Sequence, residues 1–90
     1  MLSRWGGEEF LLLIEHQGDN KRFADALRNT VSNVSLTTQE GESVCTTVSI
    51  GVSELKLTET LLTAVGRADK ALYEAKSHGR NCVVLASKAT

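Results

Sequence analysis

The feature that most constrains the fold is a change of hydrophobic period along the second half of the chain. From Gly41 to Ser53, apolar and polar residues alternate with period two, which is the pattern of a β-strand. The segment from Leu61 to Ala75 then carries apolar residues at spacings of four, three, four and three, the stripe of an amphipathic helix. A short apolar run from Asn81 to Ala86 follows. The order strand, helix, strand predicts a layered structure in which helices pack on a sheet.

The start of the chain predicts a β-hairpin. Met1 to Trp5 and Phe10 to Ile14 are two short strand-like segments. Between them lies the glycine pair Gly6-Gly7, which supplies the positive φ angles that tight hairpin turns require.

Two helices are predicted from stripes and caps. Asp19 or Asn20 can cap a first helix whose apolar stripe has spacings of four, four and three (Phe23, Leu27, Val31 and Val34). Thr58 can cap the second helix, and Gly79 can end it. The predicted order is therefore β-hairpin, α, β, α, β, an α/β fold of the α+β sandwich type.

Composition narrows the class of protein. With 90 residues, 41% hydrophobic and 23% charged, we expect a single globular unit over residues 1–90 with a modest core. The net charge of −1 and the lack of a basic run argue against a nucleic-acid partner. The longest apolar stretch, Phe10 to Ile14, is too short to cross a bilayer, so we expect no direct membrane contact and a cytoplasmic location. Cys45 and Cys82 match no zinc or redox spacing and are expected to be reduced, buried thiols.

The turn Gly6-Gly7-Glu8-Glu9 is the first candidate site. Adjacent carboxylates repel each other, so their position beside a glycine turn is explained if they share a cation, for which Mg²⁺, or Mn²⁺ in its place, is the natural candidate. Glycines also allow a nucleotide to lie against the backbone. We assign Glu8 as metal ligand and candidate base, and Glu9 as an accessory ligand or positioning group. A solvated hairpin tip is the alternative.

Lys76 and Arg80 form the second candidate site. They are four residues apart at the predicted end of the long helix, which would place both on one helical face, where two cations suit a triphosphate. The alternative is that they only complement the negative end of the helix dipole. Asp69 and Tyr73 follow the same side and either orient Lys76 or are solvated. His16 and His78 are expected at element ends and receive no role.

Three segments carry a family resemblance. Arg4 to Phe10 (RWGGEEF) resembles the RxGG[DE]EF signature of the GGDEF family. Thr47 to Val52 (TVSIGV) is similar to a later core strand of that family, and Ala68 to Asn81 (ADKALYEAKSHGRN) resembles its closing ADxALYxAKxxGRN motif. The three motifs come in the family's order and span most of the chain.

The resemblance implies a fold related to nucleotide cyclases, in which two facing GGDEF domains join two GTP molecules into cyclic di-GMP. By this likeness, Gly6 and Gly7 lie against the nucleotide, Glu8 holds the divalent ions and Glu9 assists there. Lys76 and Arg80 hold the phosphates. Transfer to an α-phosphorus builds charge on phosphoryl oxygens, which metal, Lys and Arg can neutralise.

The family's domain is longer than this chain. It begins with a strand and two helices that precede the signature hairpin and carry a metal-binding aspartate and the guanine-reading residues. An inhibitory RxxD motif would also fall before Met1. We therefore expect residues 1–90 to be the C-terminal half of one GGDEF domain, inactive by itself and prone to form homo-oligomers. The rival expectation is a non-catalytic GGDEF module that binds a guanine nucleotide or cyclic di-GMP for regulation.

Overall fold

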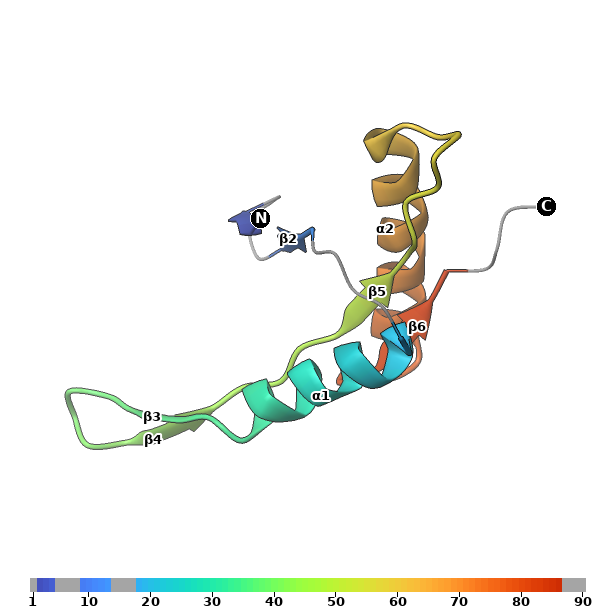
Figure 1. Cartoon of the computed structure of the whole chain (residues 1–90). Helices are drawn as coiled ribbons and strands as arrows, with labels where there is room; N and C mark the ends of the chain where they lie inside the picture. Colours follow the sequence, from blue (N-terminus) through green and yellow to red (C-terminus); the bar gives the residue numbers. More distant parts are fainter. Residues whose placement is uncertain (1, 5–8, 14–17, 87–90) are drawn as a thin grey trace.

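The chain has a mixed α+β fold, as the sequence predicts. The computed structural model describes residues 2–4, 9–13 and 18–86, and within them it has two helices and six short strands. In chain order these are β1 (Leu2–Arg4), β2 (Phe10–Leu12), α1 (Asn20–Ser32), β3 (Ser35–Thr37), β4 (Ser43–Cys45), β5 (Ile50–Val52), α2 (Leu61–Ser77) and β6 (Val83–Leu85). Figure 1 shows their arrangement. No helix among the described residues is long and apolar enough to cross a membrane.

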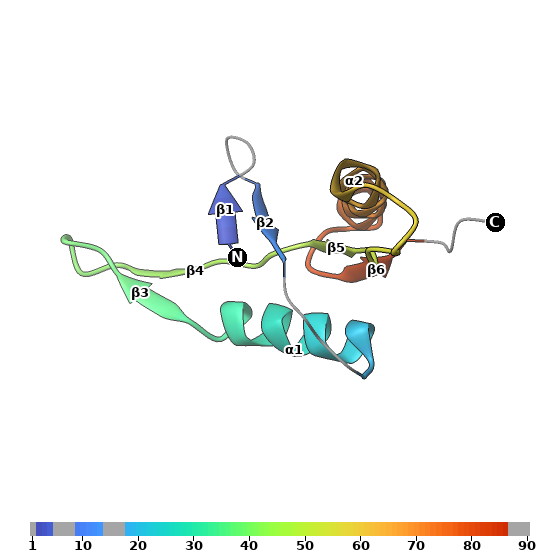
Figure 2. The same cartoon turned by 45° about the horizontal axis from the view of Figure 1, so that its top comes forward.

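The centre of the fold is the unit β5, α2, β6. β5 and β6 are parallel, with Ile50 opposite Val83 and Val52 opposite Leu85. A parallel pair needs a crossover connection, and α2 supplies it. Both helices contact these two strands, and in Figure 2 they lie on opposite sides of the strand pair. The predicted layers of helix and sheet are therefore present.

Gly51 sets the distance between β5 and α2. A Cβ atom at this position would overlap the backbone carbonyl oxygen of Ala68 and the backbone nitrogen of Leu72. Directly after β5, the Ser53 hydroxyl donates to the Ala64 carbonyl at 2.6 Å. Residues 51 and 53 thus face α2, in agreement with the predicted period-two alternation.

The cap of α2 differs from the prediction. Thr60, and not Thr58, is the N-cap, and its hydroxyl accepts a hydrogen bond from the Thr63 backbone N–H at 3.2 Å. The chain first makes a turn in which the Glu59 carboxylate accepts from the Lys56 backbone N–H at 2.9 Å and from the Arg67 guanidinium. This turn delays the start of the helix to Leu61.

α1 begins as predicted and ends earlier than predicted. Asp19 is its N-cap and accepts from the Arg22 backbone N–H at 3.1 Å. The helix ends at Ser32, with Asn33 as its C-cap, so Val34 does not belong to the helical stripe. Ala24 is buried, whereas Phe23 and Leu27 remain 40% and 39% exposed. Much of the predicted apolar stripe of α1 is therefore uncovered in this chain.

The prediction of one long strand from Gly41 to Ser53 is wrong. It divides into β4 and β5, because residues 46–49 take part in no strand pairing within the described part of the chain. β4 instead pairs with β3, which the sequence analysis missed, in an antiparallel ribbon with Leu36 opposite Val44. In Figure 1 this ribbon projects from the body of the fold. The structure as a whole, with the ribbon included, extends over 51 × 26 × 22 Å.

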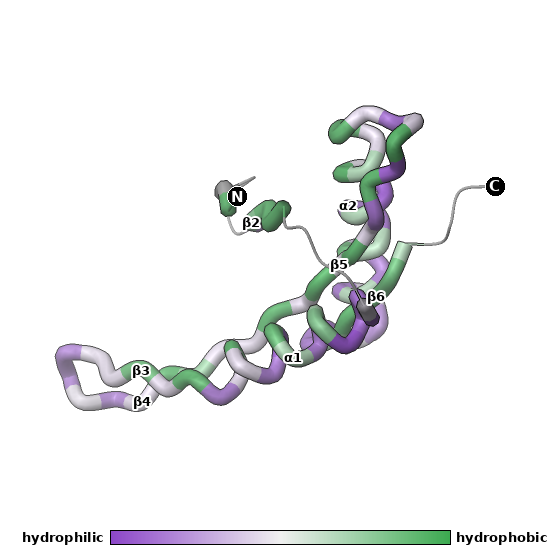
Figure 3. The backbone as a smooth tube through the Cα atoms, viewed as in Figure 1, coloured by the Kyte–Doolittle hydropathy of each residue, from purple (hydrophilic) through white to green (hydrophobic). Residues whose placement is uncertain are grey.

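The core consists of small side chains. The buried hydrophobic residues of the described chain are Ala24, Ala64, Ala71 and Ala75. Many larger apolar side chains stay exposed, and Figure 3 shows hydrophobic residues along β2 as well as along β5. The expectation of buried thiols is also wrong: Cys45 is exposed, and Cys82 is half-buried with its Sγ 3.3 Å from the Ala75 carbonyl oxygen.

We predict that Gly51→Ala destabilises the fold by roughly 3 kcal/mol, because the added methyl group would have to push α2 away from β5. Gly66→Ala is the matched control, since Gly66 is exposed on α2 and a Cβ there meets nothing within 4 Å. The control should gain about 0.5–1 kcal/mol from helix propensity. Urea unfolding measures both changes, and equal stability of the two variants would contradict the close packing.

The turn before α2 predicts a pH dependence of stability. The Lys56 backbone hydrogen bond, helped by Arg67, lowers the pKa of Glu59 below its ordinary value despite some desolvation. A depressed pKa means that this stabilisation is present above about pH 4.3, the usual pKa of Glu, and is lost as the pH falls through the folded-state pKa. Glu59→Gln should therefore flatten the acid limb of a plot of unfolding free energy against pH. An unchanged slope in this variant would refute the assignment.

Candidate functional site

The hairpin that bears the acidic signature lies next to the end of α2. β1 and β2 are antiparallel, with Leu2 opposite Leu12 and Arg4 opposite Phe10. This pairing confirms the predicted hairpin. The candidate residues Gly6, Gly7 and Glu8, and also Trp5, lie outside the described residues. Glu9, which immediately precedes β2, is the described member of the acidic pair.

Glu9 and Lys76 form an ion pair. The Lys76 Nζ donates to Glu9 Oε2 at 3.1 Å, across 67 positions of sequence. The side chains of Lys76 and Glu9 are 25% and 33% exposed, so each is partly shielded from water. Glu9 belongs to the first candidate site and Lys76 to the second, so the ion pair joins the two candidate sites. Such a pair is stronger than a fully exposed one but remains accessible to a ligand.

Arg80 does not share a helical face with Lys76, so that expectation is wrong. α2 ends at Ser77, with His78 as its C-cap and Gly79 in the left-handed conformation at φ 108°. The Arg80 N–H then bonds back to the Ala75 carbonyl at 3.1 Å, which is the long-range bond of a Schellman motif. Arg80 is therefore held in the turn after the helix, with its side chain exposed.

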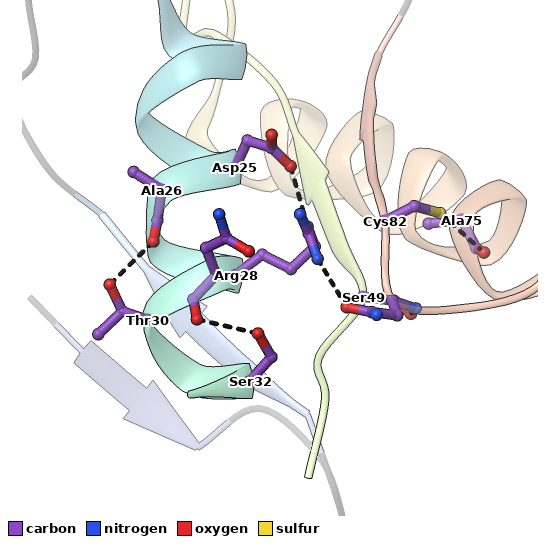
Figure 4. Close-up of polar contacts among 10 residues, drawn as sticks. Asp25, Ala26, Arg28, Thr30, Ser32, Ser49, Ala75 and Cys82 are labelled. Atoms are coloured by element: carbon purple, nitrogen blue, oxygen red, sulfur yellow. Dashed lines mark hydrogen bonds and ion pairs between the residues drawn. The ribbon is translucent and has the colours of Figure 1, made fainter. Parts of the chain in front are cut away.

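Neighbours of that turn form a hydrogen-bond network that the sequence analysis missed. The Arg28 guanidinium of α1 donates to Asp25 Oδ1 at 2.9 Å and to Asn81 Oδ1 at 2.8 Å. Figure 4 shows Arg28 beside Asp25, with its guanidinium directed toward the segment at Ser49. The Asn81 backbone N–H donates to the Ser49 hydroxyl at 3.0 Å. The residue type of Asn81 could have indicated the turn in advance, because Asn tolerates left-handed backbone angles and here follows Gly79 and Arg80 at the end of the helix.

Two other residues named with Lys76 are solvated. Asp69 is exposed and Tyr73 is 73% exposed. Neither makes a described contact with Lys76, which favours the solvated alternative. His78 lies at the helix end as expected, and His16 lies outside the described residues.

The described residues include one candidate ligand for a divalent metal ion. Among them, no group of three or more His, Cys, Asp or Glu residues is placed to hold an ion. Glu9 is the described member of the acidic pair, and its partly exposed carboxylate offers an oxygen donor at the hairpin. Oxygen donors of this kind fit Mg²⁺ or Mn²⁺, which commonly bind through one or two protein carboxylates plus substrate phosphates. The chemistry of the donor fits a divalent ion bound together with a phosphate ligand.

Comparison with protein families gives a match over most of the chain. The sequence model of one family, described as "Diguanylate cyclase, GGDEF domain", matches residues 1–82. Similar curated proteins include Diguanylate cyclase A of Treponema denticola, 40% identical over 86 residues, and Diguanylate cyclase DgcZ of Escherichia coli, 39% identical over 80 residues. The alignments cover 92% and 87% of this chain but only 23% and 27% of those proteins. The chain thus spans about a quarter of the length of these relatives.

A solved structure has the same fold. The GGDEF domain of DgcB from Caulobacter crescentus, crystallised in complex with c-di-GMP, superimposes with a TM-score of 0.84 and 33% sequence identity. The match covers 97% of this chain and 52% of that chain. Almost all of the present fold therefore corresponds to about half of that domain structure.

Proposed function

The chain belongs to the GGDEF family of diguanylate cyclase domains, and from this we propose that the protein containing it condenses two GTP molecules into cyclic di-GMP. The family membership supplies the class of reaction. The ion pair between Glu9 and Lys76 is the single structural observation that carries the proposal to particular residues.

The ion pair supports a site for a metal-bound triphosphate. Without a ligand, the carboxylate and the ammonium neutralise each other at 3.1 Å. A triphosphate with its divalent ion brings a cation for Glu9 and an anion for Lys76, so both charges keep an opposite partner when the nucleotide binds. When the metal-bound triphosphate binds, the electrostatic energy lost by breaking the Glu9–Lys76 pair is therefore largely recovered from the new contacts with the metal ion and the phosphates.

We assign roles accordingly. Gly6 and Gly7 lie against the nucleotide, Glu8 and Glu9 hold Mg²⁺ or Mn²⁺, and Lys76 with Arg80 hold the phosphates. In the reaction, a 3′-hydroxyl loses its proton, for which Glu8 is the candidate base, and its oxygen forms a bond to an α-phosphorus. The bond from that phosphorus to the β-phosphate oxygen breaks, and pyrophosphate leaves. When bound, the divalent ion neutralises charge on the phosphoryl oxygens. Lys76 and Arg80 stabilise the same charge and keep the phosphates in line.

We further propose that residues 1–90 alone turn over little or no GTP. The chain corresponds to about half of the DgcB domain structure, and the family resemblance assigns a second metal ligand and the guanine-reading residues to the other half. The described sheets each have only two strands, which supports the view that additional strands complete the domain.

A second candidate is a module that binds a guanine nucleotide or cyclic di-GMP without catalysis and regulates a neighbouring domain. The GGDEF domain of DgcB was crystallised in complex with c-di-GMP, and this observation on a similar domain supports the second candidate. The intact GGEEF signature favours catalysis, because a binding module needs no pair of adjacent carboxylates.

The decisive test is turnover of GTP by the complete gene product that contains this chain. Glu8→Gln should lower kcat by about 100-fold or more, because it removes a group that stabilises transition-state charge. Glu40→Gln, on the exposed loop between β3 and β4, is the matched control and should leave kcat unchanged. Cyclic di-GMP formation is followed by chromatography.

Turnover by Glu8→Gln at the wild-type rate would remove the catalytic assignment. GTP or cyclic di-GMP binding by a wild-type protein that makes no product would support the regulatory candidate instead. Turnover by residues 1–90 alone, at a rate close to that of the complete gene product, would contradict the proposed need for the other half of the domain.

We also propose that the isolated chain self-associates. Leu2 and Phe10 on the hairpin are 67% and 66% exposed, and both edges of each described sheet are unpaired. Exposed apolar side chains and open strand edges recruit partners. Light scattering at high micromolar concentration should show dimers or larger species, whereas a stable monomer would contradict this proposal.

A further inference from the structure

We propose that Asn81 is a positioning residue for Arg80: it fixes the backbone of the turn after α2 and so sets the direction in which the Arg80 side chain leaves it. The inference rests on the proposed role of Arg80 in holding the phosphates, and it extends that role to the residues that anchor the turn.

The backbone of this turn is in an unusual conformation. Gly79, Arg80 and Asn81 have φ angles of 108°, 63° and 49°, so three successive residues are left-handed. Arg80 and Asn81 are the two non-glycine residues with positive φ that were found among the described residues. Glycine adopts this region freely, but a residue with a Cβ adopts it at a cost in energy. Surrounding contacts must therefore hold Arg80 in place.

Those contacts come from three parts of the fold. The Arg80 N–H donates to the Ala75 carbonyl of α2 at 3.1 Å. The Asn81 N–H donates to the Ser49 hydroxyl, directly before β5, at 3.0 Å. The Asn81 side-chain oxygen accepts from the Arg28 guanidinium of α1 at 2.8 Å. Both backbone N–H groups that flank the Arg80 Cα are thus occupied, and Asn81 provides two of the three bonds.

Arg28 is itself held in the orientation that reaches Asn81. Its Nε donates to Asp25 Oδ1 at 2.9 Å one helical turn away, and its side chain is only 17% exposed. Figure 4 shows the resulting chain of contacts from Asp25 through Arg28 to the turn beside Ser49. A partly buried, doubly bonded guanidinium is a rigid donor, so the Asn81 amide cannot turn away without breaking a charge-assisted bond.

The Arg80 side chain, by contrast, has no partner among the described residues. No hydrogen bond or ion pair joins its guanidinium to another residue in the described part of the chain, and the residue is exposed. A fixed backbone that carries an unpaired cation is the arrangement expected of a group that waits for an anion. The two Asn81 hydrogen bonds would supply the fixed backbone from which the Arg80 side chain reaches the anion.

The test compares variants at position 81 that distinguish the effect of the backbone conformation from the effect of the side-chain hydrogen-bond acceptor. Asn81→Gly keeps the freedom to adopt positive φ and removes the acceptor for Arg28. Asn81→Asp keeps an acceptor at the same place and serves as the conservative rescue. Arg80→Ala and the double variant Asn81→Gly with Arg80→Ala complete a cycle. Calorimetry on the complete gene product measures the affinity for the α,β-methylene analogue of GTP in the presence of Mg²⁺. This analogue cannot be turned over, because its α- and β-phosphorus atoms are joined through carbon.

Asn81→Gly should weaken binding of the analogue about fivefold to tenfold, comparable to the loss of one charge-assisted hydrogen bond, and Asn81→Asp should stay within about twofold of the wild type. In the Arg80→Ala background, Asn81→Gly should cost nothing further, because its effect acts through the Arg80 side chain.

Two results would overturn the inference while leaving the proposed function intact. One is wild-type affinity of Asn81→Gly together with weakened binding by Arg80→Ala. The other is an equal loss from Asn81→Gly in both backgrounds, which is the mark of general damage to the fold. Wild-type affinity of Arg80→Ala itself would refute the phosphate role of Arg80, and this failure is distinguishable because it does not involve position 81.

Discussion

The close contact of β5 with α2 at Gly51 is the constraint on which the rest of the fold depends. Because residue 51 lacks a Cβ, the helix backbone approaches the strand directly, and small residues on the helix complete the contact. The position of α2 relative to the sheet is thereby set by backbone atoms and not by large side chains. A helix placed in this way delivers its C-terminal end to a defined point, which is where the candidate site begins.

The end of α2 contributes to the site in two different ways. Lys76 is still helical and reaches the hairpin, where it meets Glu9. Arg80 lies beyond the helix in a left-handed turn that is fastened to α1 and to the segment before β5. One cation is therefore aimed by the helix and the other by a hydrogen-bond network. Under the proposed function, two cations fixed by independent means would hold a flexible triphosphate in one geometry.

The sequence predicted the parts of this structure that depend on local patterns. Period-two alternation correctly placed Gly51 and Ser53 on one face of the strand, and Asp19 was correctly identified as one of two possible caps for α1. These features depend on residues close together in the chain. The GGDEF signature and closing motif identified the family, which the comparison over residues 1–82 established.

The features that the sequence did not predict depend on residues far apart in the chain. Thr58 was predicted as the cap of α2, and Thr60 was missed, because nothing local reveals that Arg67 supports a turn at Glu59. Gly79 was correctly predicted to end α2, but the four-residue spacing still placed Arg80 on the helical face of Lys76, because spacing does not show how the chain runs beyond the helix. The long strand was predicted whole because alternation does not reveal where its pairing partner ends, and β3 was missed for the same reason.

We propose that the acidic hairpin and the end of α2 form one site. The ion pair between Glu9 and Lys76 is the contact that joins these two parts of the chain. A double-mutant cycle with Glu9→Gln and Lys76→Met, measured as unfolding free energy at low ionic strength, isolates the energy of that contact. We expect a favourable coupling of about 0.5–1 kcal/mol that shrinks as salt is added, as for a partly shielded ion pair. Strictly additive effects of the two substitutions would mean that the two groups do not meet, and the account of a shared site would then fail.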